Sequence, residues 1–525
     1  MSNTGFEHHF GRLLAPALAA ALVLGAPASA QTLTIAVATA PTSMDPLFQQ
    51  LNSNHEAAIH VYDSLLNMNS MMQLKPSLAE TWRPLADPTV WEFKLRRGVK
   101  FHDGSPFTAH DVLFSYRRAM NVPGAPSTYS RALAEVDLDK SRVVDDYTLH
   151  VATKGPYPLL ARRVAGIPIV SRTIGAAANP REFNDGSKAF GTGPYKFERY
   201  VPADRVSFVA NPAYWGPKPH WQRVVLRFVT SGPTRVAALL SGDADVIASV
   251  PTADVPTLER NPKFSVACGP SARVLYWMMD VSREQALHIT AKDGKPITNP
   301  LRDLRVRQAL SMAIDRAGMV RTVMNGMAIA TNQFASEGFG GYNPAIAIPE
   351  YDVARARRLL AEAGYPNGFK MTIHATNDRY VNDSQQAQAV AQMLARVGVE
   401  VTVELQPVAN YFNKARAKEF TFAMVSFGMG TGETSSIITP ALLASSVNNY
   451  GGWKNERFES VYQRAMQSVV PAEHDRLLLE ATAIAMADVP IIPTHTEVSC
   501  WAGRANLKIE AQADQYTFAE SFTRK

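Results

Sequence analysis

Residues 77–119 of the chain read SLAETWRPLADPTVWEFKLRRGVKFHDGSPFTAHDVLFSYRRA. Within this stretch, apolar and polar residues alternate from Trp91 to Leu95, and this period of two is typical of a half-buried strand. A helix is predicted to follow, because Thr108 is a suitable N-cap and Asp111 lies three residues further on. Further along the chain, the helix predicted from Asp383 runs straight into a strand over 399–405, and a helix followed directly by a strand is typical of an α/β fold.

The second half of the chain predicts three more helices, each from an Asp cap followed by apolar residues at helical spacing. They begin at Asp303 (Val306, Ala309, Leu310, Ala313 and Ala317), at Asp352 (Leu359, Leu360 and Ala363, ending at Gly364) and at Asp383 (Ala387, Val390, Ala391, Leu394 and Val397, ending at Gly398). Further strands are predicted over 33–38, 224–229 and 399–405, and Asp45-Pro46 is predicted to start a helix.

The first thirty residues have the pattern of a secretory signal. A polar start is followed by the apolar core 13–24 (LLAPALAAALVL) and by the small residues Ala28-Ser29-Ala30. A core of this length is too short to cross a hydrocarbon layer about 30 Å thick. The junction has no Cys and no Arg pair, so neither lipid attachment nor twin-arginine export is indicated. We expect cleavage near Ala30/Gln31 and a mature protein that is free in the periplasm.

Length and composition predict an ordinary globular protein with more than one core. Of 525 residues, 46% are hydrophobic and 19% are charged, and a chain of this length is expected to form two or three lobes. The net charge is +6, but Lys and Arg are scattered. A solvated basic surface is therefore favoured over nucleic-acid binding. Beyond the signal no apolar stretch is long enough to span a membrane.

The chain has two cysteines, Cys268 and Cys500. Neither a CxxC motif nor a Cys/His cluster is present, so a zinc site is not predicted. A single disulfide is compatible with an oxidising compartment. Two separate buried thiols are the favoured interpretation.

Three stretches together resemble the periplasmic peptide-binding proteins, that is, the dipeptide-, oligopeptide- and nickel-binding group called solute-binding family 5. The first is 77–119, quoted above. The others are 191–216, which contains GTGPYKFERY and NPAYWG, and 301–369, which contains LRDLRVRQALSMAIDR and YDVARARRLLAEAGYPNGF. With the tail around 489–509 the resemblance covers essentially the whole mature chain.

This resemblance implies an α/β fold of two lobes that close over a ligand, a Venus flytrap, with an extra α/β subdomain inserted in the first lobe. Carried over to this chain, the signal peptide is 1–30, the first lobe is 31–75, 190–270 and 503–525, the inserted subdomain is 76–189, and the second lobe is 271–502. Two crossover strands near 266–275 and 496–505 would form the hinge, which would bring Cys268 and Cys500 close together.

The resemblance also implies the substrate-binding component of an ABC importer. Such a protein captures a peptide-like small solute and delivers it to an inner-membrane permease, and we expect it to be a monomer that binds no nucleic acid. A binder of a nickel chelate, a glutathione-like or an opine-like compound is the alternative on the same fold.

A catalytic alternative finds little support in the motifs. GxSxG, SxxK, HExxH and the phosphate-binding loop are all missing, and the glycine-rich segment 428–432 is not followed by Lys. His102-Asp103 and His110-Asp111 lie inside the scaffold signature, where surface or capping roles are favoured. We therefore expect no enzyme, no metal and no cofactor, and a secreted hydrolase remains as the remote alternative.

Family members place their ligand contacts on loops that face the gap between the lobes. The matching candidates are Ser43, Asn52 and Asn54 on the first lobe, and Arg379, Tyr380, Glu433, Asn448, Tyr450 and Trp453 on the second. Arg379 matches the position where dipeptide binders hold an Arg for the ligand carboxylate, and a guanidinium binds a carboxylate bidentately.

The glycine-rich loop departs from the dipeptide binders, which carry an Asp there for the ligand's α-amino group. In this chain the loop reads GMGTGETSS, and its one acid is Glu433. Either Glu433 binds the amine, or the ligand has no ammonium at this position. The sequence leaves both alternatives open.

Overall fold

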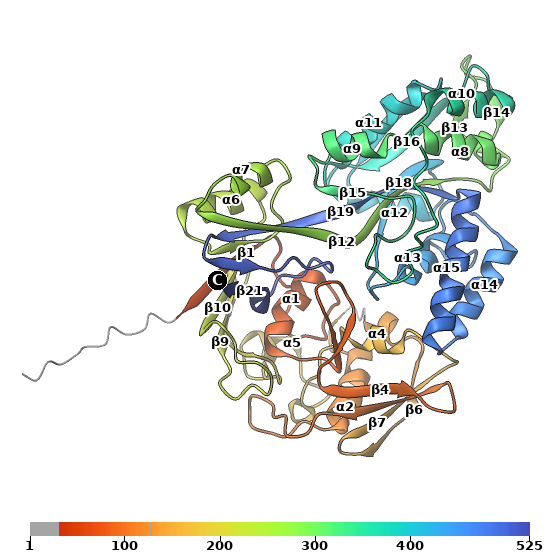
Figure 1. Cartoon of the computed structure of the whole chain (residues 1–525). Coiled ribbons are helices and arrows are strands. Elements are labelled where there is room, and N and C mark those ends of the chain that lie inside the picture. The colour runs from red at the N-terminus through yellow and green to blue at the C-terminus, as the bar shows by residue number, and fades with distance from the viewer. Residues whose placement is uncertain (1–30, 126–128) are drawn as a thin grey trace, which may run out of the picture.

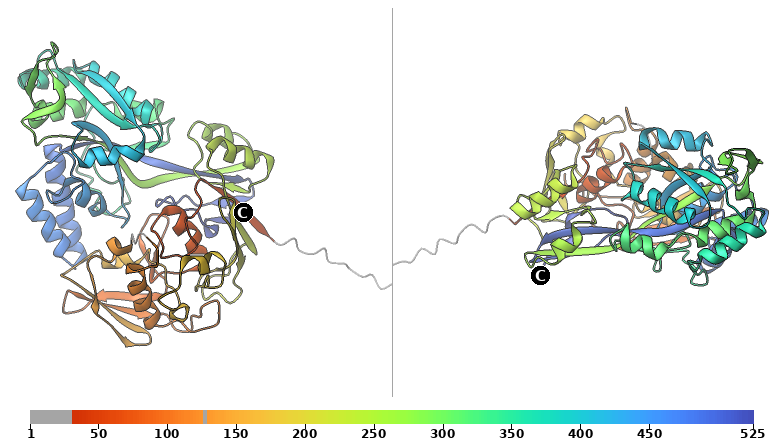
Figure 2. Two further views of the ribbon diagram at one scale, coloured as in Figure 1. Left: turned by 180° about the vertical axis from the view of Figure 1, so that it is seen from behind. Right: turned by 90° about the horizontal axis from the view of Figure 1, so that it is seen from above.

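Two long antiparallel strands, β12 (Phe264–Met279) and β19 (Ile491–Arg504), connect the two lobes of the molecule (Figure 1). The structure is a computed structural model that describes residues 31–125 and 129–525, so the predicted signal peptide lies outside the described residues. Figure 2 shows the same two strands from behind and from above, as long green and blue arrows. They pair from Phe264 opposite Arg504 to Met278 opposite Ile491. The molecule is the two-lobed α/β structure that the resemblance implied.

The largest sheet has 13 strands and continues through both lobes. Its strands in chain order are β1 (Thr32–Val37), β8 (Tyr195–Val201), β9 (Arg205–Ala210), β10 (Arg223–Phe228), β11 (Val246–Ile247), β12, β13 (Gln285–Thr290), β14 (Pro296–Thr298), β15 (Ala328–Ala330), β16 (Lys370–Thr376), β17 (Glu400–Gln406), β18 (Phe422–Gly428) and β19. Its main path is β14-β13-β16-β18-β12-β19-β11-β1-β10-β9-β8, with β15 beside β19 and β17 beside β16. β12 and β19 therefore lie between the strands of the two lobes.

Three smaller sheets are also present among residues 31–125 and 129–525. They are the four-stranded sheet of β4 (Ala79–Pro84), β5 (Val90–Leu95), β7 (Thr148–Thr153) and β6 (Val136–Asp145), the hairpin of β2 (Leu66–Met68) and β3 (Leu74–Pro76), and the pair β20 (Leu507–Ile509) and β21 (Phe522–Arg524). All strands of the four-stranded sheet fall within the segment 76–189 that we expected to be the inserted subdomain.

Helices cover these sheets. Their bounds are α1 (Asn52–Val61), α2 (Ala109–Met120), α3 (Tyr129–Ala132), α4 (Leu160–Val164), α5 (Pro180–Asn184), α6 (Gly232–Ser241), α7 (Val255–Glu259), α8 (Leu304–Met312), α9 (Arg316–Thr322), α10 (Val353–Glu362), α11 (Asp383–Ala395), α12 (Val408–Arg416), α13 (Ser435–Leu442), α14 (Glu456–Gln467) and α15 (Pro471–Asp488). Among the described residues no helix is both long and apolar enough to cross a membrane.

The core follows from the alternation of side chains along β12. Val274, Tyr276 and Met278 belong to the apolar cluster that includes residues of α12 to α15, whereas Leu275 and Trp277 belong to the cluster on the other face, with residues of α8, α10 and α11. Successive strand residues point to opposite faces of a sheet, so the central strand contributes to both cores. A separate large cluster fills the first lobe and the segment around the four-stranded sheet.

Most of the predicted elements are confirmed. Trp91, Phe93 and Leu95 are buried on β5, and the Asp111 carboxylate accepts hydrogen bonds from the backbone N and the hydroxyl of Thr108 at the start of α2. Helices α10 and α11 and strands β1, β10 and β17 lie where the sequence placed them, within one or two residues. Asp352 caps α10 as predicted, but the N-cap of α11 is Asn382, so the predicted cap at Asp383 is wrong.

Two further local predictions are wrong. Asp45 does not start a helix: it lies in a turn, buried, and its carboxylate pairs with Arg118 of α2. The helix predicted from Asp303 through Ala317 is two helices, α8 and α9, because Asp315 caps the second one by accepting from the backbone N of Gly318. Ala317 is therefore exposed rather than in the core.

Candidate functional site

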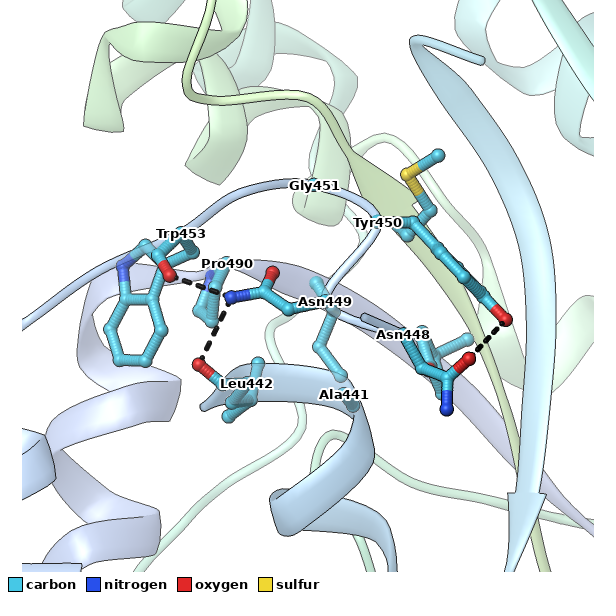
Figure 3. Close-up of a pocket in the computed structure, with 11 residues that line it drawn as sticks. Ala441, Leu442, Asn448, Asn449, Tyr450, Gly451, Trp453 and Pro490 are labelled. Carbon is cyan, nitrogen blue, oxygen red and sulfur yellow. Dashed lines mark hydrogen bonds between the residues drawn. The ribbon is translucent and has the colours of Figure 1, made fainter. Parts of the chain in front are cut away.

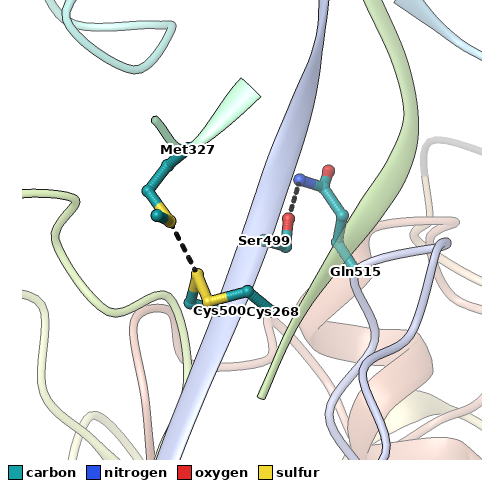
Figure 4. The surroundings of a disulfide bond; sticks show 5 residues. All are labelled: Cys268, Met327, Ser499, Cys500 and Gln515. Carbon is teal, nitrogen blue, oxygen red and sulfur yellow. Dashed lines mark hydrogen bonds between the residues drawn. A yellow bond between two sulfur atoms is a disulfide. The ribbon is translucent and has the colours of Figure 1, made fainter. Parts of the chain in front are cut away.

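The hinge strands are cross-linked by a disulfide between Cys268 of β12 and Cys500 of β19 (Figure 4). The two residues are directly opposite each other in the register of the strands, which places their Cα atoms 4.2 Å apart. The expectation that they are close is confirmed, whereas the favoured interpretation of two separate thiols is wrong. Sequence alone could not decide this, because bonding depends on the register of strands whose cysteines are 232 residues apart.

On the first lobe, two of the three candidate side chains are used to hold their own loop. Asn54, which is 3% exposed, accepts from the backbone N of Thr42 (3.0 Å) and donates to its hydroxyl (3.0 Å). The Ser43 hydroxyl is also buried, and it accepts from the backbone N of Asp45. Asn52, the first residue of α1, is exposed. This loop of the first lobe is thus fixed by its polar side chains.

Asn448, Tyr450 and Trp453 come together on one loop of the second lobe, around a small cavity (Figure 3). The cavity measures about 10 Å³, roughly the space for one water molecule. The Tyr450 hydroxyl donates to Asn448 Oδ1 (3.1 Å), and the Trp453 indole N–H donates to Asp488. These side chains are therefore packed against one another, and the cavity cannot hold a solute.

Arg379 and Tyr380 follow directly after β16, at its end toward the hinge. Tyr380 is buried, and its hydroxyl accepts a hydrogen bond from the backbone N of Ser426 on β18 (3.1 Å). Arg379 is exposed, and its guanidinium lies 5.5 Å from the centre of the Tyr380 ring. Within the described part of the chain, no group accepts a hydrogen bond from this guanidinium. Arg379 is thus an accessible cation without a committed partner.

A charged pair lies on the hinge strands themselves. Arg273 Nε on β12 is 3.8 Å from Glu497 Oε2 on β19, an ion pair without a hydrogen bond. Burial raises the pKa of Glu497, and the positive charges of Arg273 and Arg379 oppose that effect. The two arginines therefore act on the same buried carboxyl group.

Glu433 is engaged inside the protein. Its carboxylate accepts from the Ser435 hydroxyl, lies 3.3 Å from His474 Nε2, and is 3.6 Å from Arg162 Nε. Burial acts to raise the pKa of Glu433, but the hydrogen bonds and charge of His474 outweigh it and the pKa is lowered. Burial likewise acts to lower the pKa of His474, and Glu433 outweighs it and raises that pKa. Both shifts favour the charged pair, a carboxylate on Glu433 beside an imidazolium on His474.

The glycine-rich loop contacts residues from the first half of the chain. Arg162 of α4 donates to the carbonyl of Thr431 (2.8 Å), and a Cβ on Gly432 would lie 2.5 Å from the carbonyl oxygen of Met72. Gly432 also has a φ of +70°, which disfavours other residues. Glycine is required here by the close approach of the turn between β2 and β3, and this contact joins the lobes at a second place besides the hinge.

The histidines that raised the question of a metal have structural partners. His102 Nδ1 accepts from the backbone N of Gly191, and its Nε2–H donates to the carbonyl of Gly193, so it ties the first signature stretch to the second. His110 is exposed, 3.9 Å from Asp146. In residues 31–125 and 129–525 no group of three or more His, Cys, Asp or Glu side chains is arranged to hold a metal ion.

The model of the bacterial extracellular solute-binding proteins, family 5, matches residues 73–449. The chain belongs to this family. That segment includes all of the four-stranded sheet, β12 and the loops that carry Arg379 and Glu433.

Named relatives are similar over nearly the whole chain. The glutathione-binding protein GsiB of Escherichia coli (strain K12) is 28% identical over 516 residues, covering 95% of each chain. Heme-binding protein A of Haemophilus influenzae is 27% identical and covers 89% of this chain and 87% of its own. The solved structure of HbpA2 from Haemophilus parasuis, 24% identical, superposes with a TM-score of 0.84 over 94% of this chain and 100% of its own. This family-5 protein is accordingly a substrate-binding component of the kind that serves ABC importers.

Sequence reasoning missed four residues that shape the site: Arg273, Glu497, Arg162 and His474. A signal for the first two was present, because each is a charged residue beside a stretch that begins or continues with strand-forming residues: Arg273 precedes VLYWMM, and Glu497 follows IIPTHT. A buried charge in such a run is uncommon unless it is paired or used. The other two carried no local signal, since they lie on helices of ordinary composition.

Proposed function

We propose that this protein binds a peptide-like solute in the periplasm, as a monomer and without turnover, and delivers it to an inner-membrane ABC permease. Arg379 carries the assignment: it is an exposed guanidinium beside the hinge whose donors have no acceptor among the described residues. Such a group binds a carboxylate through two parallel hydrogen bonds. The solute therefore presents a carboxylate to the second lobe.

The state of Glu433 supports the alternative in which the solute has no ammonium group at the glycine-rich loop. A carboxylate that is already neutralised by His474 and hydrogen-bonded by Ser435 gains little from a second cation. A free dipeptide amine is thus a poor fit there. Glutathione-like solutes are favoured among peptides, since GsiB is named for binding glutathione. Opine-like compounds and nickel chelates are the alternative class.

Capture involves a rotation of the lobes about β12 and β19. A solute that contacts both lobes binds the closed form better than the open form, and this difference in affinity drives closure. The turn at Met72 and Arg162 on one lobe then meets the glycine-rich loop on the other, as it does in this structure.

Arg379→Ala is expected to weaken binding of the solute roughly ten- to a hundredfold, the loss of hydrogen bonds to a charged group. Arg379→Lys keeps the charge but loses the planar guanidinium that donates two parallel hydrogen bonds, so it should recover only part of the affinity. A thermal-shift screen of dipeptides, glutathione, opines and nickel–histidine provides the ligand, and calorimetry gives the dissociation constants.

Arg358→Ala, at an exposed arginine of α10, is the matched control and should bind like the wild type. If folded Arg379→Ala protein binds within about twofold of the wild type, the carboxylate is bound elsewhere and the assignment of Arg379 is wrong.

A further inference from the structure

Three buried side-chain oxygens at the hinge end of the second lobe have no hydrogen-bond partner among the described residues. They are Glu497 Oε1 on β19, Ser426 Oγ on β18 and Ser271 Oγ on β12, and their residues are 5%, 6% and 0% exposed. The three strands are adjacent, because β12 pairs with β18 on one side and with β19 on the other. Ser271 and Glu497 both lie within the register shift between β12 and β19, and Ser426 is opposite Leu275, just beyond that shift. Native proteins satisfy the great majority of such atoms, so an unsatisfied group on each of three neighbouring strands indicates that something else completes this place.

Two guanidinium groups border the same place. Arg273 is on β12 opposite Gly428, within the bulge where the pairing of β12 with β19 shifts register, and Arg379 follows β16. In the described residues neither guanidinium donates a hydrogen bond, so ten N–H donors are available in all, at about five for each side chain. Burial raises the pKa of Tyr380 to about 12, and both arginines oppose that rise, as they do at Glu497.

The nearby acids do not neutralise both arginines. Glu497 faces Arg273 at 3.8 Å without a hydrogen bond. Asp383 is committed to the start of α11: it accepts from the Thr376 hydroxyl (2.8 Å) and from the backbone N of Arg379 (3.1 Å). An anion is therefore the group that these free donors lack.

We propose that Arg273 and Arg379 bind one and the same carboxylate group, against the hinge strand β12, and that Glu497 is the positioning residue that orients Arg273. That the carboxylate belongs to a peptide-like solute rests on the function proposed above. Because the subsite consists of two arginines, the protein would bind solutes that carry a carboxylate in preference to neutral ones. It would also couple binding to closure, because one of its two arginines is carried by the hinge itself.

Acetate is the probe that tests the subsite without knowledge of the solute. At constant ionic strength, acetate replacing chloride should raise the melting temperature of the wild type, with half of the effect at a concentration on the order of 10 mM, as for a single weak anion contact. Arg273→Gln should raise the half-effect concentration about tenfold, and Arg273→Lys less, because it retains the charge. Arg457→Gln, at an exposed arginine of α14, should match the wild type.

Two results would overturn the proposal: a wild type that acetate stabilises no more than chloride does, or a folded Arg273→Gln variant whose half-effect concentration is within twofold of the wild type. Peptide binding separates this proposal from the previous one. If a peptide-like solute binds the wild type and Arg273→Gln equally, the subsite is wrong and the proposed function stands. If acetate behaves as expected but no peptide-like solute competes with it, the subsite stands and the proposed function falls.

Discussion

Replacing both Cys268 and Cys500 with serine is expected to lower the free energy of unfolding by about 2–5 kcal/mol. The bond closes a loop of 232 residues between two strands, and a cross-link of this span removes many conformations from the unfolded chain. In a chain of this size a change of that magnitude corresponds to a fall of a few degrees in the melting temperature. Differential scanning calorimetry of the two proteins measures it.

Wild-type protein treated with a reductant is the matched control, and it should melt with the double variant rather than with the oxidised protein. A double variant that melts within about 1 °C of the oxidised wild type would show that the cross-link contributes nothing to stability. The same comparison tests whether the hinge needs the bond for its alignment, because the variant should still bind the solute if strand pairing alone maintains the register.

Arg118→Met is expected to destabilise the protein by about 3–5 kcal/mol, because it leaves the buried Asp45 carboxylate without its partner. Arg118 donates to Asp45 Oδ1 (2.9 Å), to Oδ2 (2.5 Å) and to the carbonyl of Ala178 (2.9 Å). Both side chains are almost completely buried, at 1% and 0% exposure. The pair fixes the loop 42–47 of the first lobe to α2, so the variant should also loosen the loop on which Ser43 lies.

Arg117→Met serves as the control, since Arg117 is the neighbouring arginine on α2 and is exposed. Its loss should change the free energy of unfolding by no more than about 0.5 kcal/mol, as for an ordinary surface position. Adding Asp45→Asn to Arg118→Met should restore part of the lost stability, because it removes the unpaired charge. Equal effects of the two arginine variants in urea unfolding would contradict a structural role for the buried pair.

Elements with local signals were predictable from the sequence. Strand β5 was found because its residues alternate, and α10 and α11 were found because an Asp at the start, an apolar stripe and a terminal glycine agree with one another. Each of these signals acts over a few residues. The family resemblance added the order of the lobes, which local patterns do not contain.

The predictions that were wrong concern residues whose partners are distant in the sequence. Asp45 followed by Pro46 is a good helix start by local rules, but the carboxylate is used by Arg118, 73 residues away. Glu433 was a candidate for a ligand amine, and its accessibility was decided by His474, 41 residues further on. The sequence thus predicted which loops form the candidate site. Which charged side chains on those loops are free to contact a ligand could be assigned only from the fold.

We infer that the protein binds a solute and leaves it unchanged. Purified protein incubated with a mixture of dipeptides, tripeptides and glutathione, followed over hours by mass spectrometry, tests this most directly. We predict that at most one equivalent of any compound per protein chain is removed from solution, and that denaturing the protein returns it with its mass unchanged. Formation of a new compound in excess of one equivalent per chain would show turnover and would contradict binding without chemical change.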